Sequence, residues 1–473
     1  MHRKFIILLL LAVLLIYSSS LRNGFVLDDQ VLIVENPLIK SGEAKAIFSS
    51  SIYDLPKTYR PIQQLSYSLD YKIWGLNPFG FHLSNIILHI LNSVLVYFII
   101  CLIATIPLAQ AASLMFAVHP VNSSVVAYIG GRADSLAALC MLLSILFFRR
   151  FTLPSSKKNY ILSLLFAWLA LLCRESSLIL PLLLFLVLSI NPSGLKRFKY
   201  ILPFLALDLA YIILRVKVFG AQAFWLPFSG LPLFFNALNF LYIILKYLNI
   251  LILPLNLHML RTTPFIISLL DPRVLFTFLI LTLLGFFLFK ERKNKLVLFG
   301  AAWFFCGLIP VFFLLSAYPW LKAALLAESW LYLPCVGVFL LVALIMKKLS
   351  RVGKFLFIIV VIIFSLLTYQ ANDYWKDNLS VYRNILKYLP QENPVRKNLI
   401  REYLRLGMYA EAATELKKFS QSYPESSERF VLEGDYYFAK GELAQARNSY
   451  TEALLINKYD PQALEKLRIL QER

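Results

Sequence analysis

Long apolar runs alternate with short polar or basic stretches along the first 371 residues. Runs of this kind are typical of helices that cross a membrane, although several fall short of the ~20 residues that a perpendicular span needs. A first run covers residues 5–17. Eleven more follow, at 86–105, 108–118, 133–148, 159–173, 177–190, 199–217, 237–253, 273–289, 296–315, 329–346 and 354–370.

The pattern changes near Asp373, after which charged residues recur every few positions and no long apolar run remains. Matching residues in this tail are separated by 34 positions, which is the tetratricopeptide period. The sequence therefore predicts a tetratricopeptide domain over 372–473, with repeats near 395–428 and 429–462, after a membrane domain over 1–371. The matching pairs are Pro390 and Pro424, Tyr403 and Tyr437, Gly407 and Gly441, and Ala412 and Ala446.

The composition fits an integral membrane protein with an all-α fold. Hydrophobic residues make up 59% of the 473 positions, against 16% charged residues. The net charge of +20 would suggest nucleic acid in a soluble protein, but here the basic residues cluster at the ends of apolar runs. The five cysteines form no CxxC pair and indicate neither a disulfide framework nor a zinc site.

Four basic segments set the expected orientation: 149–158, 196–199, 290–295 and 347–354. Positive loops stay on the cytoplasmic side. If 237–253 were a full crossing, 290–295 would lie outside. We therefore expect 237–253, or part of 218–236, to be re-entrant or to lie flat, which leaves about 11 spans and places the tail on the outer side.

The polar and aromatic stretch 21–81, interrupted by Pro37, Pro56, Pro61 and Pro78, predicts an outer loop with short helices on the membrane surface. The apolar run before it could be a cleaved signal peptide or a retained first span. Asp28 and Asp29 open this loop, at the outer membrane boundary in either case. A carboxylate pair there is a candidate catalytic base, or two helix-capping aspartates.

His82, Asn85, His89 and Asn92 recur at three- and four-residue steps and therefore share one helix face. Such a polar stripe either joins helices or lines a cavity.

In this order and spacing, the motifs resemble the transmembrane and tetratricopeptide-repeat O-mannosyltransferases, within the C-type glycosyltransferase fold. The resemblance covers nearly the whole chain. It rests on the segments 25–29, Tyr59-Arg60-Pro61, 81–85 with His89, His119-Pro120-Val121, 131–134, Arg174-Glu175-Ser176, Ala327-Glu328 with 331–334, and the repeats after Trp375.

Two positions depart from the family pattern. Such sequences often read H-P-V-H-x-E, whereas this chain has Asn122 and Ser124. The usual Glu-Arg before Tyr-Leu-Pro is Glu328-Ser329 here. The first departure removes a plausible pair of metal ligands, so a divalent metal has no supporting ligand motif and no cofactor is assigned. The second removes a cation that could bind phosphate.

The resemblance implies transfer of a sugar from a polyprenyl-phosphate carrier to a hydroxyl acceptor. Asp28 or Asp29 would be the base, with Asp28 preferred. Arg60, Arg132 and Arg174 would bind the donor phosphate, because a guanidinium grips two phosphate oxygens at once. Alternatively, Arg132 pairs with Asp134, and Arg174 with Glu175. Glu328 could be a second acid or a structural partner, and His119 a structural or a catalytic residue.

The sequence leaves the sugar and the acceptor open, although the repeats favour a protein Ser or Thr over a lipid-linked glycan. Two other functions also fit: a membrane-anchored repeat adaptor for envelope proteins, and a transporter of lipid-linked sugars. We expect a bacterial inner membrane with periplasmic repeats, or an endoplasmic reticulum membrane with lumenal repeats.

Overall fold

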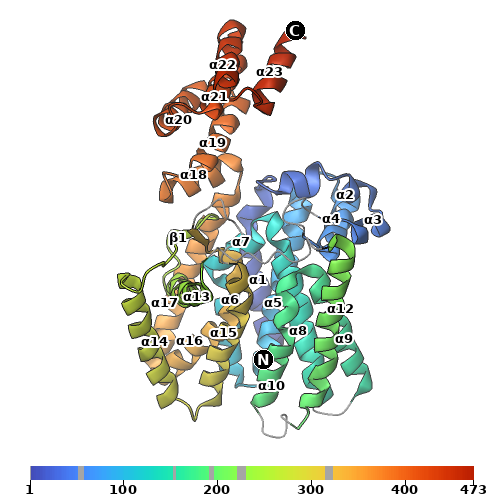
Figure 1. Ribbon diagram of the computed structural model, residues 1–473. Helices are drawn as coiled ribbons and strands as arrows, with labels where there is room; N and C mark the ends of the chain where they lie inside the picture. Colours follow the sequence, from blue (N-terminus) through green and yellow to red (C-terminus); the bar gives the residue numbers. More distant parts are fainter. Residues whose placement is uncertain are drawn as a thin grey trace. The chain divides into compact units, whose positions relative to one another are not determined.

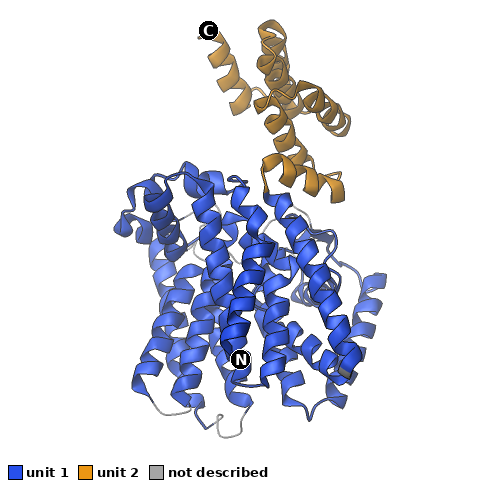
Figure 2. Cartoon of the chain, turned by 180° about the vertical axis from the view of Figure 1, so that it is seen from behind, with its two compact units in different colours: residues 1–375 blue, residues 376–473 orange. Residues whose placement is uncertain are grey.

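The computed structural model describes residues 2–51, 58–152, 156–190, 196–220, 231–314 and 323–472. Residues 52–57 and 221–230, and residue 315 of the predicted run 296–315, lie outside the described residues. The chain divides into two compact units, Met1–Trp375 and Lys376–Arg473 (Figure 2). The sequence prediction places the boundary between 371 and 372.

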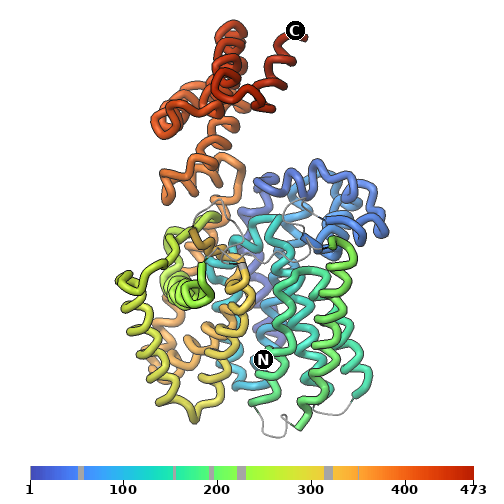
Figure 3. The backbone as a smooth tube through the Cα atoms, viewed as in Figure 1, coloured from blue at the N-terminus to red at the C-terminus, as the bar shows by residue number. Residues whose placement is uncertain are grey.

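Unit 1 is a bundle of helices around one large apolar core (Figures 1 and 3). Each of the predicted apolar runs overlaps one long helix, and the runs 177–190, 199–217 and 329–346 begin in a short turn before it. The long elements are α1 (His2–Ile16), α5 (Pro78–Cys101), α6 (Ile106–Val118), α8 (Arg132–Thr152), α9 (Lys157–Cys173), α10 (Leu180–Ser189), α12 (Leu202–Phe219), α13 (Leu233–Ile252), α14 (Pro272–Lys290), α15 (Lys295–Leu314), α16 (Cys335–Lys348) and α17 (Ser350–Asn372).

Six helices in the described part of the chain are long and apolar enough to cross a membrane: those that include α5, α8, α13, α14, α15 and α17. The windows in α14 and α17 are only 11% and 17% buried within the protein. Apolar faces so widely exposed are stable only in lipid, so this is an integral membrane protein. The other apolar helices, such as α6 and α10, are shorter.

Short helices follow α1, as the prolines and turn residues of 21–81 predict. They are η1 (Ser18–Arg22), η2 (Gln30–Val34), α2 (Pro37–Ser41), α3 (Ala44–Ser49) and α4 (Pro61–Trp74). Further single turns connect the long helices: η3 (Pro120–Asn122), α7 (Ser123–Val126), η4 (Ile129–Gly131), η5 (Glu175–Ile179), η6 (Phe198–Ile201), η9 (Glu328–Leu331) and η10 (Asp373–Trp375). Two strands, β1 (Thr262–Pro264) and β2 (Ala323–Leu325), pair antiparallel, with Thr262 opposite Leu325.

The four basic segments meet at one end of unit 1. The Arg197 guanidinium donates to the Phe151 carbonyl at 3.3 Å, and Lys295 donates to the Ile190 carbonyl at 3.0 Å. Lys348 pairs with Glu291 at 2.8 Å. These contacts link 149–158 to 196–199, 290–295 to the end of α10 shortly before 196–199, and 347–354 to 290–295, so all four lie at what we call the basic end.

Arg132 and Arg174 lie at the opposite end, because α8 starts at Arg132 and α9 returns from the basic end to Arg174. We call this end the acidic-arginine end, since its carboxylates pair with arginines. Helix α13 lies along it and is seen nearly end-on in Figure 1, whereas α14 and α15 run lengthwise.

The contacts of α13 also show that this helix runs along the acidic-arginine end. Asn239 donates to the Ile266 carbonyl at 3.0 Å, and Arg273, in the first turn of α14, stacks on Tyr242. Tyr247 donates to the Ala327 carbonyl, and the Leu251 carbonyl meets His119. These residues cover about 18 Å of helix, yet every contact reaches a segment at the acidic-arginine end.

Unit 2 contains α18 (Asn378–Tyr388), α19 (Asn393–Arg405), α20 (Tyr409–Ser422), α21 (Ser427–Ala439), α22 (Leu443–Ile456) and α23 (Pro461–Gln471). The pair α21–α22 repeats the bounds of α19–α20 at an offset of 34. Gly407 and Gly441 have φ of +71° and +82° in the turns between the paired helices, a conformation that favours glycine. Ala412 and Ala446 are fully buried where the helices cross.

Candidate active site

The aspartate pair lies in a tight, strained turn between α1 and η2. Leu27 has φ of +51°, a left-handed conformation that costs a non-glycine residue about 1–2 kcal/mol. The Val26 amide donates to Asp29 Oδ2, and the Asp29 amide donates to the Val26 carbonyl, both at 3.0 Å. A π-helical turn, η2, follows directly. Backbone strain of this kind concentrates at functional sites.

The turn is fixed to two helices, α5 and α17. Phe25 packs edge-on against Phe81 of α5, with ring centroids 5.4 Å apart, and His82 lies against the backbone of Asn23 and Gly24. The Asn23 side chain donates to the Asn372 carbonyl at 2.9 Å, which ties the turn to the end of α17. The position of the aspartates is therefore set by groups more than 50 and more than 340 residues away along the chain.

The two aspartates have different environments. Asp29 is fully buried, whereas Asp28 is exposed. Burial raises the pKa of the Asp29 carboxyl to about 8, although the amides of Val26 and Gly130 and the charge of Arg132 act in the opposite direction. A substrate can therefore reach Asp28, while Asp29 holds the turn.

Arg132 is enclosed by the chain. Its guanidinium pairs with Asp70 at 2.6 Å and donates to Asn85 Oδ1 and to the Phe81 carbonyl, both at 2.7 Å. It also lies 4.6 Å from the centre of the Tyr67 ring. With a side chain only 1% exposed, Arg132 joins α4, α5 and α8, and its partner is Asp70 rather than Asp134.

The other two predicted arginines form a half-exposed cluster. Arg60 grips Glu175 with two nitrogens, at 2.7 and 3.2 Å, and Arg174 pairs with Asp134. Arg215 of α12 lies within electrostatic range of Glu175. This cluster has three cations and two carboxylates. The partner of Arg174 is therefore Asp134, and the predicted alternative pairing with Glu175 is wrong.

The cluster and the aspartate turn are neighbours. Tyr67 of α4 lies within electrostatic range of Asp29, Arg132 and Arg60, and its hydroxyl donates to the Ile129 carbonyl. On the other side, the Ser329 side chain bonds Asp134. Residues from five separate parts of the sequence thus meet at the acidic-arginine end.

Glu328 is buried beside Ser329 and faces an arginine that the sequence reasoning missed. Its Oε1 accepts from the His258 amide at 3.0 Å and from Arg261 Nη2 at 3.4 Å. Burial raises the pKa of the Glu328 carboxyl to about 7, with the Arg261 charge opposing. Arg261 is a single basic residue between apolar runs, so no spacing pattern marks it.

The polar stripe of α5 joins helices. His89 bonds the Tyr332 hydroxyl at 2.8 Å and the Ala117 carbonyl at 3.1 Å, and Asn85 donates to the Tyr128 carbonyl as well as accepting from Arg132. His119 contacts the Leu251 carbonyl and accepts from the Val121 amide. All of these side chains are buried, and their contacts are structural. Within the described ranges, no three His, Cys, Asp or Glu residues gather as a metal site would require.

Comparison with known proteins agrees with the sequence motifs. Residues 61–218 match the family described as "Dolichyl-phosphate-mannose-protein mannosyltransferase". A protein O-mannosyl-transferase of Caenorhabditis elegans is 26% identical over 428 residues, which cover 84% of this chain and 59% of the relative. The human "Protein O-mannosyl-transferase TMTC3" is 28% identical over 438 residues, which cover 78% and 46%.

The chain is similar to the protein O-mannosyl-transferases. The resemblance predicted from the motifs is thereby confirmed. The chain spans about half the length of the O-mannosyl-transferases that it matches over most of its own length. Among solved structures, ArnT from Cupriavidus metallidurans bound to undecaprenyl phosphate aligns with a TM-score of 0.45 and 12% identity, covering 94% of this chain and 77% of that protein.

Proposed function

We propose that this protein is a membrane glycosyltransferase that moves a sugar from a polyprenyl-phosphate carrier to a Ser or Thr hydroxyl of a protein. The observation that carries the proposal is an exposed carboxylate, Asp28, on a strained turn whose buried Asp29 lies, like Arg60, within electrostatic range of Tyr67. The names of the similar proteins make a mannosyl donor and a protein acceptor the first pair to test.

In the proposed reaction, the acceptor hydroxyl oxygen attacks the anomeric carbon of the donor sugar. Its proton passes to the Asp28 carboxylate, and the bond between the anomeric carbon and the phosphate oxygen breaks. The polyprenyl phosphate leaves with the bonding electrons and gains negative charge. Arg60 and Arg174 are the proposed cations that stabilise this charge, because both are partly exposed.

Asp29 and Arg132 have supporting roles in this proposal, unlike Asp28, Arg60 and Arg174. Asp29 accepts from the Val26 amide inside the turn, so it is a positioning residue for Asp28. Arg132 has bonds to the chain on all three guanidinium nitrogens, so we propose that it supports the site without binding phosphate.

The proposed membrane topology places the basic end in the cytoplasm and the acidic-arginine end on the outer side. Helix α13 then lies at the outer boundary, which removes the conflict that a crossing at 237–253 would create with the basic segment 290–295. Because α17 ends at the acidic-arginine end, the chain enters unit 2 on the outer side. We propose that unit 2 is a tetratricopeptide domain that holds the acceptor protein. A bacterial inner membrane stays a prediction.

Labelling the two ends of α13 would test this topology. L233C and L253C should both react with a membrane-impermeant maleimide added to the outer side, since both residues are more than half exposed. S268C and K293C, at opposite ends of α14, serve as the control pair and should react from opposite sides. Reaction of L233C and L253C from opposite sides would contradict the placement of α13.

The function is tested by transfer of labelled mannose from a synthetic polyprenyl-phosphate donor to a Ser/Thr peptide by the purified chain in lipid vesicles. D28N should reduce kcat by about 10²–10⁴-fold without loss of folded protein. D29N should reduce it less, because its amide oxygen can still accept from Val26. Equal rates for D28N and wild type would remove Asp28 from the mechanism. Transfer absent from the wild type, with acceptor binding or carrier movement intact, would favour the adaptor or transporter.

A further inference from the structure

Two arginines flank β1 and have nearly equal exposure. Arg261 directly precedes the strand and its side chain is 21% exposed, while Arg273, in the first turn of α14, is 26% exposed. Each lies beside a carboxylate. The two arginines differ in hydrogen bonding. Among the described residues, Arg273 uses all three of its guanidinium nitrogens, whereas Arg261 uses one.

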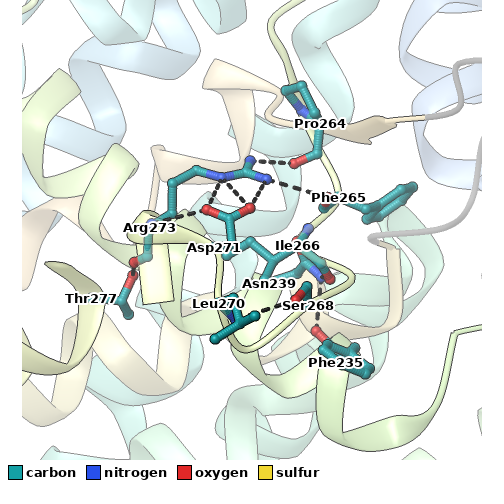
Figure 4. Close-up of polar contacts among 10 residues, drawn as sticks. All are labelled: Phe235, Asn239, Pro264, Phe265, Ile266, Ser268, Leu270, Asp271, Arg273 and Thr277. Atoms are coloured by element: carbon teal, nitrogen blue, oxygen red, sulfur yellow. Dashed lines mark hydrogen bonds and ion pairs between the residues drawn. The ribbon is translucent and has the colours of Figure 1, made fainter. Parts of the chain in front are cut away.

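Arg273 is saturated by the chain (Figure 4). Its Nε and Nη2 both contact the Asp271 carboxylate, at 2.6–3.0 Å. Its Nη1 donates to the Pro264 carbonyl at 2.6 Å, and Nη2 also reaches the Phe265 carbonyl at 3.3 Å. All three nitrogens are thus engaged, and Arg273 pins the segment after β1 to the start of α14.

Arg261 makes both of its hydrogen bonds through a single nitrogen. Nη2 donates to the Asn256 carbonyl at 2.6 Å and to Glu328 Oε1 at a long 3.4 Å. Its Nε is buried and has no hydrogen-bond partner in the part of the chain that the structure describes. A guanidinium carries five N–H donors in a planar fork, and this one leaves most of them for another acceptor. An unsatisfied buried donor is costly, so a bound acceptor would be favourable.

The chain nevertheless holds Arg261 firmly in place. The Leu326 amide donates to the Arg261 carbonyl at 2.8 Å, and the next residue, Thr262, begins the pairing of β1 with β2. Asn256, whose carbonyl anchors Nη2, has φ of +58°, a conformation that asparagine tolerates better than most residues. This preorganisation suits a group that must meet a ligand in one orientation.

Arg261 also belongs to the acidic-arginine end. Its partner Glu328 precedes Ser329, and Ser329 bonds Asp134, the partner of Arg174. Arg261 is thus linked through Glu328 and Ser329 to the ion pair of Arg174 and Asp134.

We propose that Arg261 binds a phosphate oxygen of the polyprenyl-phosphate donor at the acidic-arginine end. The inference rests on the proposed function for the identity of the ligand. Within the described ranges Nη1 keeps both of its N–H donors for a ligand, and hydrogen bonds between a guanidinium and phosphate oxygens are charge-assisted and strong. Glu328 orients the fork through Nη2 and leaves the remaining donors to the ligand.

The test measures binding of polyprenyl phosphate and of the matching uncharged polyprenol to the purified full chain in nanodiscs. R261A should weaken binding of the phosphate by about 10–100-fold, the usual size of a lost hydrogen bond to a charged group, and leave polyprenol binding unchanged. R273A is the matched control and should leave both affinities unchanged. Equal affinity of R261A and wild type for polyprenyl phosphate, or equal weakening for both lipids, would overturn the proposal.

Two further variants address folding and charge placement. R261K keeps the charge without the planar fork and should bind polyprenyl phosphate with intermediate affinity, which keeps the test open if R261A fails to fold. The double variant R261A/S329R places a cation at position 329, next to Glu328, and should recover part of the lost affinity. Absence of any selective effect on the phosphate lipid in both variants would contradict the proposal.

This assay separates the inference from the proposed function. Binding of polyprenyl phosphate that depends on Arg261, in a chain that transfers no sugar, would sustain the inference and remove the glycosyltransferase. Sugar transfer with the same donor KM in R261A and wild type would overturn the inference and sustain the proposed glycosyltransferase.

Discussion

The junction around Arg132 and the cluster around Arg60 and Arg174 lie close together, and both are built from arginine–carboxylate pairs. They differ in exposure. Arg132 and Asp70 are 1% and 7% exposed, whereas Arg60 and Glu175 are 17% and 26% exposed. The Arg132 guanidinium also donates to the Asn85 side-chain oxygen and to the Phe81 carbonyl, whereas the Arg60–Glu175 pair is partly exposed. Arginines from neighbouring motifs can thus be either enclosed by the chain or partly exposed.

The largest effect should come from breaking the enclosed pair. R132A leaves the Asp70 carboxylate buried without its cation, which typically costs 3–5 kcal/mol of unfolding free energy. We expect little folded protein, measured as the monodisperse fraction after detergent extraction. R132A with normal yield and normal thermal stability would show that the junction is less important than its contacts indicate.

A smaller, functional effect is expected from the half-exposed pair. R60Q should raise the donor KM roughly tenfold, about 1.4 kcal/mol, because one phosphate contact is lost. The free energy of unfolding should fall by less than in R132A, since Arg174 and Arg215 also lie within electrostatic range of Glu175 and its carboxylate is not left without a cation. Steady-state kinetics at varied donor concentration and a thermal melt provide the two measurements. A fall in stability with unchanged KM would place Arg60 in the structural class with Arg132.

The smallest effect concerns Asp29, whose buried carboxyl lies within electrostatic range of Arg132. Since the pKa of Asp29 is raised to about 8 in the folded chain, the folded state keeps a proton that the unfolded state loses near pH 4. Stability should therefore decline as pH rises from about 4 to 8. D29N removes this titrating group. Between pH 6 and 8, the melting temperature of D29N should fall by a few °C less than that of the wild type.

The matched control for this pH series is D28N, whose exposed carboxyl should leave the stability profile close to that of the wild type. Identical pH profiles for D29N and wild type would show that the Asp29 carboxyl is not buried in its protonated form.

The sequence predicted the helical membrane bundle and the similarity to O-mannosyl-transferases, because apolar run length and motif order are local properties. It could not divide the roles within the motifs. The partner of Arg132 is Asp70, 62 positions away, and no spacing rule identifies such a pair. Similarly, His89 and Asn85 share one polar helix face, and only packing reveals that His89 bonds the Ala117 carbonyl of α6 and Asn85 bonds Arg132 of α8.

Two other features depend on the fold. The left-handed Leu27 has no residue-type signal, since leucine rarely adopts that conformation. Arg261 reaches Glu328 only because β1 and β2 pair, and a two-strand contact between segments 60 residues apart is not readable from the pattern. Charge balance alone left open whether 237–253 or part of 218–236 fails to cross the membrane, and only the fold shows that the contacts of α13 run along one end of unit 1.

The most direct measurement is an experimental map of the protein in nanodiscs with polyprenyl phosphate bound. The account predicts phosphate density at the acidic-arginine end, within hydrogen-bonding distance of Arg60 or Arg174 and open to Asp28, with the lipid tail running into the bilayer. Phosphate density at the basic end, or Asp28 turned away from the bound headgroup, would contradict it.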